Sequence, residues 1–183
     1  CVALGIAEGQ TYTDRDGNGL IDILYIEQLD SMRYNLTGAC SGSICNGYEL
    51  KRSLDFRDSL SYRNYRSYIS STHDSSFYAR GEGWRPVGSA TYINSPFLQE
   101  ENPFNTLFEG NRFTLNHLFI NRVSTHFVGL FGYTQSNSIL RNIGLRTVSV
   151  SGNEFVGGLV GWNNGGTISQ SYATGYVSGR THV

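Results

Sequence analysis

The pattern of apolar and polar positions repeats itself in the C-terminal third of the chain. The run Phe127-Val128-Gly129-Leu130-Phe131-Gly132-Tyr133 returns as Phe155-Val156-Gly157-Gly158-Leu159-Val160-Gly161-Trp162. Val156 lies 28 residues after Val128, and Val148-Ser149-Val150-Ser151-Gly152 is matched downstream by Tyr176-Val177-Ser178-Gly179. A fixed period of about 20–50 residues is typical of proteins built from stacked repeats. The pattern therefore predicts a stack of similar layers.

The residue types within each copy predict strands. Short runs of Val, Ile, Leu and aromatic residues alternate with Gly, Asn and Ser, and no window here has the spacing of an amphipathic helix. Asn163-Asn164-Gly165-Gly166 consists only of turn residues and predicts a corner. Stacked layers cover one another's apolar side chains, which a single layer cannot do alone. We expect an all-β fold, a right-handed parallel β-helix.

Earlier segments extend this prediction toward the N-terminus. Alternating apolar residues between Phe104 and Arg122 predict two strands around the turn Gly110-Asn111. Helical spacing of apolar residues predicts one helix over residues 23–36, ended by Thr37-Gly38. Because the ends of a solenoid need covering, we expect this helix to cap the first coil.

The second copy resembles a known repeat. Val156-Gly157-Gly158-Leu159-Val160-Gly161, followed by Gly166-Thr167-Ile168-Ser169 and Ser171-Tyr172-Ala173-Thr174-Gly175-Tyr176, is similar to the GLUG repeat. That resemblance implies a bacterial surface or secreted protein of the filamentous-haemagglutinin-like adhesin type. It predicts an N-terminal cap over residues 1–50, first coils over 51–126 with an insertion at 57–81, and GLUG-type repeats over 127–183. The first copy departs from the pattern by having one glycine fewer and a longer middle.

The last residues repeat the lead-in to a further copy. Ser178-Gly179-Arg180-Thr181-His182-Val183 corresponds to Ser151-Gly152-Asn153-Glu154-Phe155-Val156, which precedes a core motif. A coil left open here would expose apolar side chains and unpaired strand edges. We expect either that the repeats continue in a longer chain or that another molecule covers this end through self-association.

A calcium-type loop precedes the predicted helix. In the run from Asp14 to Asp22, oxygen-bearing side chains occupy positions one, three, five and nine around a glycine at position six. The predicted Ca²⁺ ligands are Asp14, Asp16, Asn18, the Leu20 carbonyl and Asp22. The glutamate usual at position twelve is replaced by Tyr25. A simple Asp/Asn–Gly turn without metal fits the same residues. We favour a structural calcium site that orders the N-terminal cap.

Composition and cysteines narrow the class of protein. The formal net charge is −1, which gives no general electrostatic reason to bind nucleic acid or anionic membrane, and no apolar run is long enough for a transmembrane helix. Cys40 and Cys45 lie in a polar loop and predict a local disulfide in an exported protein. Cys1 is compatible with a lipid-anchored N-terminus, an intermolecular bridge or simply the first residue of a fragment.

One segment has the composition of a ligand-binding surface. Residues 62–68 interleave tyrosine and arginine, and aromatic rings of this kind stack on sugars or single-stranded nucleic acid. If the protein binds a glycan, we expect Tyr62, Tyr65, Tyr68 and Trp84 to contact it. A polar loop or edge strand inserted between coils explains residues 62–68 more simply.

The sequence offers little material for catalysis. Glycosidases need two carboxylates about 5–9.5 Å apart, yet after Asn102 the acids are only Glu109 and Glu154. We therefore expect a non-catalytic, extracellular structural or adhesive β-helix of a bacterial surface, able to assemble into fibres, with Ca²⁺ as its structural metal. The alternative is a carbohydrate-binding or polysaccharide-degrading β-helix, because this fold also supports lyases and hydrolases.

Overall fold

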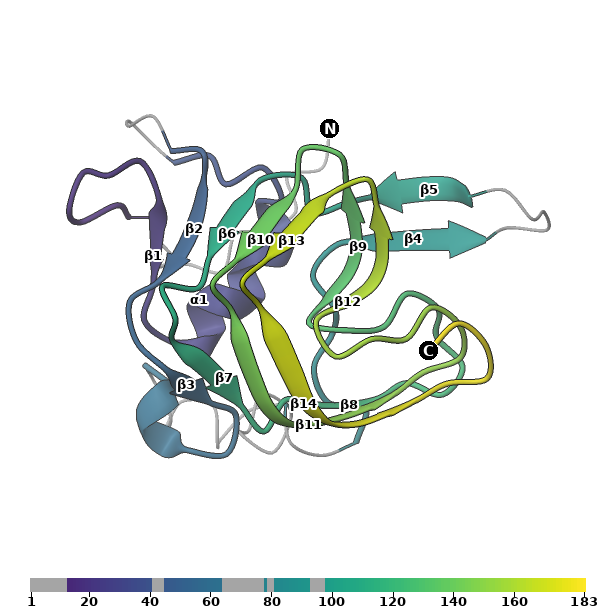
Figure 1. The fold of residues 1–183 in the computed structure, drawn as a ribbon. Coiled ribbons are helices and arrows are strands. Elements are labelled where there is room, and N and C mark those ends of the chain that lie inside the picture. Colours follow the sequence, from purple (N-terminus) through teal and green to yellow (C-terminus); the bar gives the residue numbers. More distant parts are fainter. Residues whose placement is uncertain (1–12, 41–44, 64–77, 79–80, 93–97) are drawn as a thin grey trace.

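The computed structural model describes residues 13–40, 45–63, 78, 81–92 and 98–183. Within these residues the chain is mostly strands with one short α-helix, and its parallel sheets form a β-solenoid of about four turns. Figure 1 looks along the solenoid axis, with the C-terminal coil nearest the viewer. The chain winds as a right-handed spiral, which confirms the predicted fold class.

One side of the solenoid is a five-stranded parallel sheet with the order β1-β2-β6-β10-β13. Its strands are β1 (Ile21–Ile23), β2 (Gly47–Leu50), β6 (Leu107–Glu109), β10 (Ile139–Arg141) and β13 (Thr167–Ser169). The strands pair in register, so equivalent residues of successive coils lie above one another. Facing the core, this gives the column Ile21, Tyr48, Phe108, Leu140 and Ile168. The first four of these side chains are at most 2% exposed and form part of one continuous core.

Two further parallel sheets complete the coils. The second contains β3 (Leu54–Asp55), β7 (Thr114–Asn116), β8 (Phe119–Asn121), β11 (Gly144–Ser151) and β14 (Tyr172–Ser178). The third pairs β9 (Phe131–Gln135) with β12 (Val160–Asn164). The strands expected on either side of Gly110-Asn111 are β6 and β7, and each pairs with other coils, so this turn is a corner of the solenoid.

The corners place the same backbone conformation at equivalent positions. Asn142 and Gln170, which directly follow β10 and β13, both have positive φ, at 57° and 48°. A second corner has positive φ at Phe127, Phe155 and His182. Such values are rare for bulky residues. Here the rings stack, with centroids 5.1 Å apart for Phe127–Phe155 and 4.6 Å for Phe155–His182. The repeat therefore includes an aromatic column along one corner.

The predicted helix is shorter than expected and begins later. Ile23 lies in β1, and the helical residues are α1 (Ile26–Ser31) followed by the 3₁₀ turn η1 (Met32–Tyr34). The strand takes Ile23 because β1 pairs with β2 in the first sheet. The helix lies behind the coils in Figure 1 and closes the N-terminal end of the core, with Ile26, Leu29 and Met32 fully buried.

Two elements interrupt the solenoid. The 3₁₀ turn η2 (Ser59–Ser61) follows β3. The antiparallel pair β4 (Ser89–Tyr92) and β5 (Leu98–Asn102), which the sequence did not predict, projects to the side of the coils in Figure 1.

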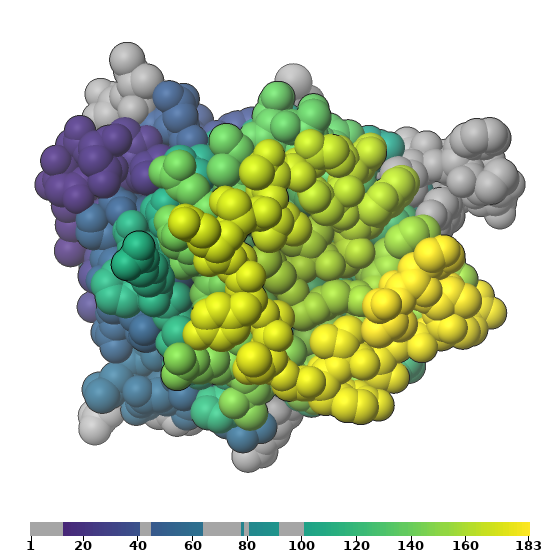
Figure 2. Space-filling view, in the orientation of Figure 1, coloured from purple at the N-terminus to yellow at the C-terminus, as the bar shows by residue number. Residues whose placement is uncertain are grey.

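The C-terminal coil forms one broad face of the molecule, shown toward the viewer in Figure 2. Its strands β12, β13 and β14 are each the last of their sheet. In the described part of the chain each of these strands has a neighbouring strand on one side, and Ile168, which continues the inward column, is 43% exposed. Tyr176 and Val183 are 62% and 68% exposed.

Candidate metal centre

The calcium-type loop is held together by the carboxylate of Asp14. Asp14 Oδ1 accepts a hydrogen bond from the Gly17 amide and Asp14 Oδ2 accepts one from the Gly19 amide, both at 2.8 Å. Gly17 and Gly19 have φ values of 73° and 86°, which favour glycine. In Figure 1 this loop projects from the solenoid just before β1. The local sequence thus dictates a tight turn that leads into the first strand.

The first sheet brings two carboxylates from neighbouring coils onto the outer end of this turn. Asp22 in β1 pairs in register with Glu49 in β2, and the two residues are 1% and 3% exposed. Asp16 reaches the same place from the loop. One carboxylate oxygen of each of these three residues lies within 4.8 Å of the others. We call Asp16, Asp22 and Glu49 the acidic triad.

The ammonium group of Lys51 lies among these carboxylates. Its Nζ is 2.7 Å from Asp16 Oδ2 and 3.0 Å from Glu49 Oε1, but 3.6 Å from Asp22 Oδ1. The hydrogen bond to Asp16 raises the pKa of Lys51 and lowers that of Asp16. Burial raises the pKa of the Asp22 carboxyl above its ordinary value. The carboxylates therefore stabilise a positive charge at this site. Burial makes the negative charge on Asp22 unfavourable.

The structure brings together only part of the predicted ligand set. Asp16 and Asp22 lie side by side, while Asp14 is engaged by loop amides. Asn18 donates its Nδ2 to Glu49 Oε1 at 2.7 Å, and its Oδ1 accepts the Leu20 amide at 2.9 Å.

Sequence reasoning missed Glu49. Glu49 lies 27 residues after Asp22, close to the 28-residue step of the C-terminal copies, and that spacing was the available signal.

Beyond the acidic triad, the same outward row continues with paired charges. Glu109 follows Glu49 in register and Arg141 follows Glu109. Asn111 links the coils, because its side-chain Nδ2 donates to Glu49 Oε2 at 2.6 Å and its backbone N–H donates to Glu109 Oε1 at 2.8 Å. Burial opposes ionisation of Glu109, but donors on Asn111, Asn142 and Arg141 outweigh it and lower its pKa. Glu109 is thus held in its ionised form by donors from Asn111, Asn142 and Arg141.

The predicted disulfide is confirmed. Cys40 and Cys45 are bonded, with their Cα atoms 5.3 Å apart. The bridge precedes β2. Cys1 lies outside the described residues, so the three alternatives given for it stay open.

Two of the four rings predicted to contact a glycan, Tyr62 and Trp84, lie in the described part of the chain, and neither is at the surface. Trp84 is fully buried, and its indole donates to the Leu130 carbonyl at 3.1 Å. Tyr62 is 4% exposed, and its hydroxyl donates to the Phe56 carbonyl at 2.9 Å. Both rings therefore serve the core, because the apolar body of each is covered by neighbouring aromatic residues. Tyr65 and Tyr68 lie outside the described residues.

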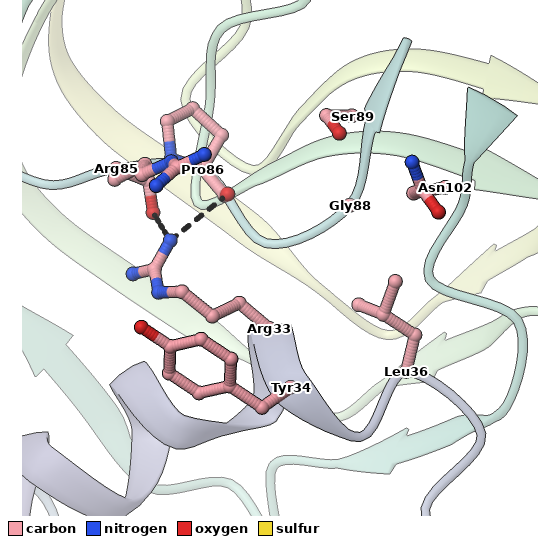
Figure 3. A pocket seen from close by; sticks show the side chains of 8 residues that line it. All are labelled: Arg33, Tyr34, Leu36, Arg85, Pro86, Gly88, Ser89 and Asn102. Atoms are coloured by element: carbon pink, nitrogen blue, oxygen red, sulfur yellow. Dashed lines mark hydrogen bonds between the residues drawn. The ribbon is translucent and has the colours of Figure 1, made fainter. Parts of the chain in front are cut away.

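A pocket of about 380 Å³ opens between the end of the helix and the β4–β5 pair (Figure 3). Its lining residues are Arg33, Tyr34, Leu36, Arg85, Pro86, Gly88, Ser89 and Asn102. The Arg33 guanidinium donates to the carbonyls of Arg85 and Pro86 at 2.9 and 3.4 Å. It also lies 5.2 Å from the centre of the Trp84 ring. Arg33 therefore fastens the helix to the coil, while Tyr34 at the rim of the pocket is 72% exposed.

Comparisons with known proteins give two relatives. The chain is 28% identical over 174 residues to Halomucin of Haloquadratum walsbyi. The aligned region covers 95% of this chain but 2% of that protein. It is 31% identical over 90 residues to a protein of Evansella cellulosilytica described as a Gly-rich membrane protein, covering 48% of this chain and 9% of the relative. The chain thus spans a small part of both relatives.

Two further comparisons returned nothing. No family model matches, so the resemblance to the GLUG repeat stays a prediction. No solved structure matches the chain. In the part of the chain that the structure describes, no helix is long and apolar enough to cross a membrane.

Proposed function

We propose that this chain is a non-catalytic structural segment of a larger, surface-associated extracellular protein. The observation that carries the proposal is the in-register stacking of successive coils around one continuous apolar core. Such a stack is stiff along its axis because each coil is hydrogen-bonded to the next along its strands. Its role would be to hold neighbouring parts of the protein apart and present them away from the cell.

The relatives support a segment of a larger molecule. The match to Halomucin covers nearly all of this chain but 2% of that protein. The second relative is described as a membrane protein, which supports the surface assignment. Adhesion and fibre formation are further proposals, which rest on the predicted similarity to surface adhesins.

The two carboxylates that follow Asn102 in the sequence, Glu109 and Glu154, support the non-catalytic assignment. Glu109 is bound by Asn111, Asn142 and Arg141, so its oxygens are already occupied by donors. Glu154 pairs with Arg180 at 2.7 Å. A general acid or base must be able to exchange its proton with substrate, and groups engaged in this way are poorly suited to that role.

Two measurements test the proposal. Antibodies raised against the chain should label intact cells of the producing organism, and external protease should remove the label. Labelling only after permeabilisation would show that the surface assignment is wrong. Incubation with a panel of polysaccharides should release no reducing sugar. Release that disappears in the Glu109→Gln variant would replace the structural proposal with an enzymatic one.

The pocket beside Tyr34 supports a second candidate function, the binding of an acidic saccharide. Tyr34 offers an exposed ring for stacking, and Arg85, also exposed, supplies a guanidinium for a carboxylate. Titration with oligosaccharides of uronic acids should then perturb the Tyr34 resonances by NMR. Tyr34→Ala should abolish binding, whereas Tyr176→Ala, at an exposed tyrosine in β14, should not.

A further inference from the structure

The acidic triad leaves a buried negative charge only partly compensated. Asp22 is 1% exposed, and in the described part of the chain its Oδ1 accepts no hydrogen bond. Its other oxygen accepts the Arg15 amide at 3.2 Å. A buried carboxylate oxygen without a donor is costly, because nothing replaces the water it has lost.

Lys51 offsets the cost of burying the Asp22 carboxylate only in part. One ammonium group faces three carboxylates, and it approaches Asp22 Oδ1 only to 3.6 Å, too far for a hydrogen bond. Asp22 and Glu49 also stack directly in register on neighbouring parallel strands. Like charges at paired positions of a sheet repel each other. A divalent cation would offset this repulsion more completely than an ammonium group.

We propose that Asp16, Asp22 and Glu49 bind a calcium ion jointly, with Glu49 replacing the carboxylate that the loop lacks at its twelfth position. Two oxygens on opposite sides of Ca²⁺, each at about 2.4 Å, are about 4.8 Å apart. One carboxylate oxygen from each residue of the triad lies within 4.8 Å of the other two, a spacing compatible with a single shared ion. The ammonium group of Lys51 then moves out toward solvent.

The donor atoms specify the class of metal. Every group in the triad is a carboxylate, and carboxylates suit Ca²⁺ or Mg²⁺ rather than Zn²⁺ or copper. Mg²⁺ demands nearly ideal octahedral geometry at about 2.0–2.1 Å, whereas Ca²⁺ accepts irregular sets at longer distances. A triad drawn from a loop and two strands is irregular, which favours calcium.

The ion would act as a cross-link between coils. Asp16 belongs to the loop, Asp22 to β1 and Glu49 to β2, so bound calcium joins the loop to the first two rungs of the solenoid. This function is separate from the proposed role of the whole segment, and either can fail without the other.

The test uses the whole chain, freed of metal with a chelator and titrated with CaCl₂ by calorimetry and thermal unfolding. We expect a Kd of roughly 0.1–1 mM, as in extracellular calcium modules, and a rise in Tm with added calcium. Asp22→Asn and Glu49→Gln should each weaken binding by about ten-fold or more. Lys51→Met should strengthen it several-fold, because it removes the competing cation. Glu82→Gln, at an exposed carboxylate paired with Arg122, is the matched control and should leave binding unchanged.

Each outcome decides the proposal. No heat and no Tm shift in either wild type or Lys51→Met, at concentrations about ten-fold above roughly 1 mM, would overturn the site. Unchanged binding in a folded Glu49→Gln variant would show that the loop alone holds the ion. An equal response to MgCl₂ would overturn the assignment to calcium. Circular dichroism establishes that each variant is folded, and Lys51→Met provides a readout that does not depend on removing an acid.

Discussion

At the residue scale, the corner formed by Phe127, Phe155 and His182 shows how the repeat tolerates an unfavourable backbone conformation. All three have φ between 54° and 58°. A left-handed conformation costs a residue with a side chain about 1–2 kcal/mol. The stacked rings offset that cost, since each favourable aromatic pair contributes about 0.5–1.5 kcal/mol. Phe155 stacks on both of its neighbours along the column and lies 5.3 Å from Trp162, measured between ring centroids.

This account predicts an unusual order of stability for two variants at Phe155. Both Phe155→Ala and Phe155→Gly lose the ring contacts, but only glycine relieves the left-handed strain. After allowance for the greater flexibility of glycine in the unfolded chain, we expect Phe155→Gly to be about 0.5–1 kcal/mol more stable than Phe155→Ala. Urea unfolding of the two variants measures the difference. If Phe155→Ala is as stable as Phe155→Gly or more stable, the corner carries no appreciable strain.

Glu109 gives a pH-dependent prediction at the same scale. Its pKa is lowered in the folded state, so the native protein binds fewer protons there than the unfolded chain does. The stability from its ionised form is complete above the ordinary pKa of 4.5 and is lost as the pH falls through the lower native value. Glu109→Gln should therefore cost about 1.5–3 kcal/mol at pH 7, the size of hydrogen bonds to a charged group.

The difference between Glu109→Gln and wild type should shrink as the pH falls below 4.5. Urea unfolding with a chelator present measures it without a contribution from metal. Glu82→Gln is the control, because the Glu82–Arg122 pair is at the surface and such pairs contribute little. A constant difference between pH 7 and pH 3 would show that the carboxylate charge of Glu109 is not what stabilises the fold.

At the element scale, the Cys40–Cys45 bridge fixes the approach to β2. It closes a loop with a sequence separation of five residues. The loop-entropy relation gives about 2 kcal/mol for a ring of this size, less than for a long loop. The double variant Cys40→Ser/Cys45→Ser should lose about that much stability in urea unfolding. Reducing agent should lower the stability of the wild type to that of the variant and leave the stability of the variant unchanged. A loss of stability much larger than about 2 kcal/mol would mean that β2 depends on the bridge for its pairing.

The same scale shows what the sequence could and could not predict. The 28-residue step predicted the parallel coils, because in-register stacking requires equivalent residues at a nearly constant interval. The helix start was wrong, since pairing with β2 draws Ile23 into a strand. The β4–β5 pair was missed because it lies outside the repeat.

Site residues were harder to predict for a related reason. Glu49 joins Asp22 only through the register of β1 on β2, which local spacing around the loop does not reveal. Trp84 was a candidate contact for a glycan, but composition cannot distinguish a ring that contacts ligand from one that fills the core. The structure surrounds it with Phe56 and Tyr78, at centroid distances of 5.4 and 5.6 Å.

At the scale of the whole molecule, the two ends of the solenoid differ. Helix α1 buries Ile26 and Leu29 at the N-terminal end. At the opposite end β12, β13 and β14 are the last strands of their sheets, and Ile168 is 43% exposed. Open strand edges and exposed apolar residues of this kind favour association.

This asymmetry predicts how the chain would associate with a second copy in solution. For the 183-residue chain tested by itself, two C-terminal faces that pair by two-fold symmetry give a closed dimer. Sedimentation velocity over a range of concentrations should show a monomer–dimer equilibrium.

Ile168→Glu should shift this equilibrium toward monomer because a charge cannot be buried in that interface without a partner. Leu60→Glu introduces the same charge at a residue that is 71% exposed in η2, far from β13 in the sequence, and should have no effect. Wild type that stays monomeric at every concentration, or equal behaviour of the two variants, would show that the C-terminal face is not adhesive toward a second copy. Filaments in wild type would show instead that the chain associates head to tail.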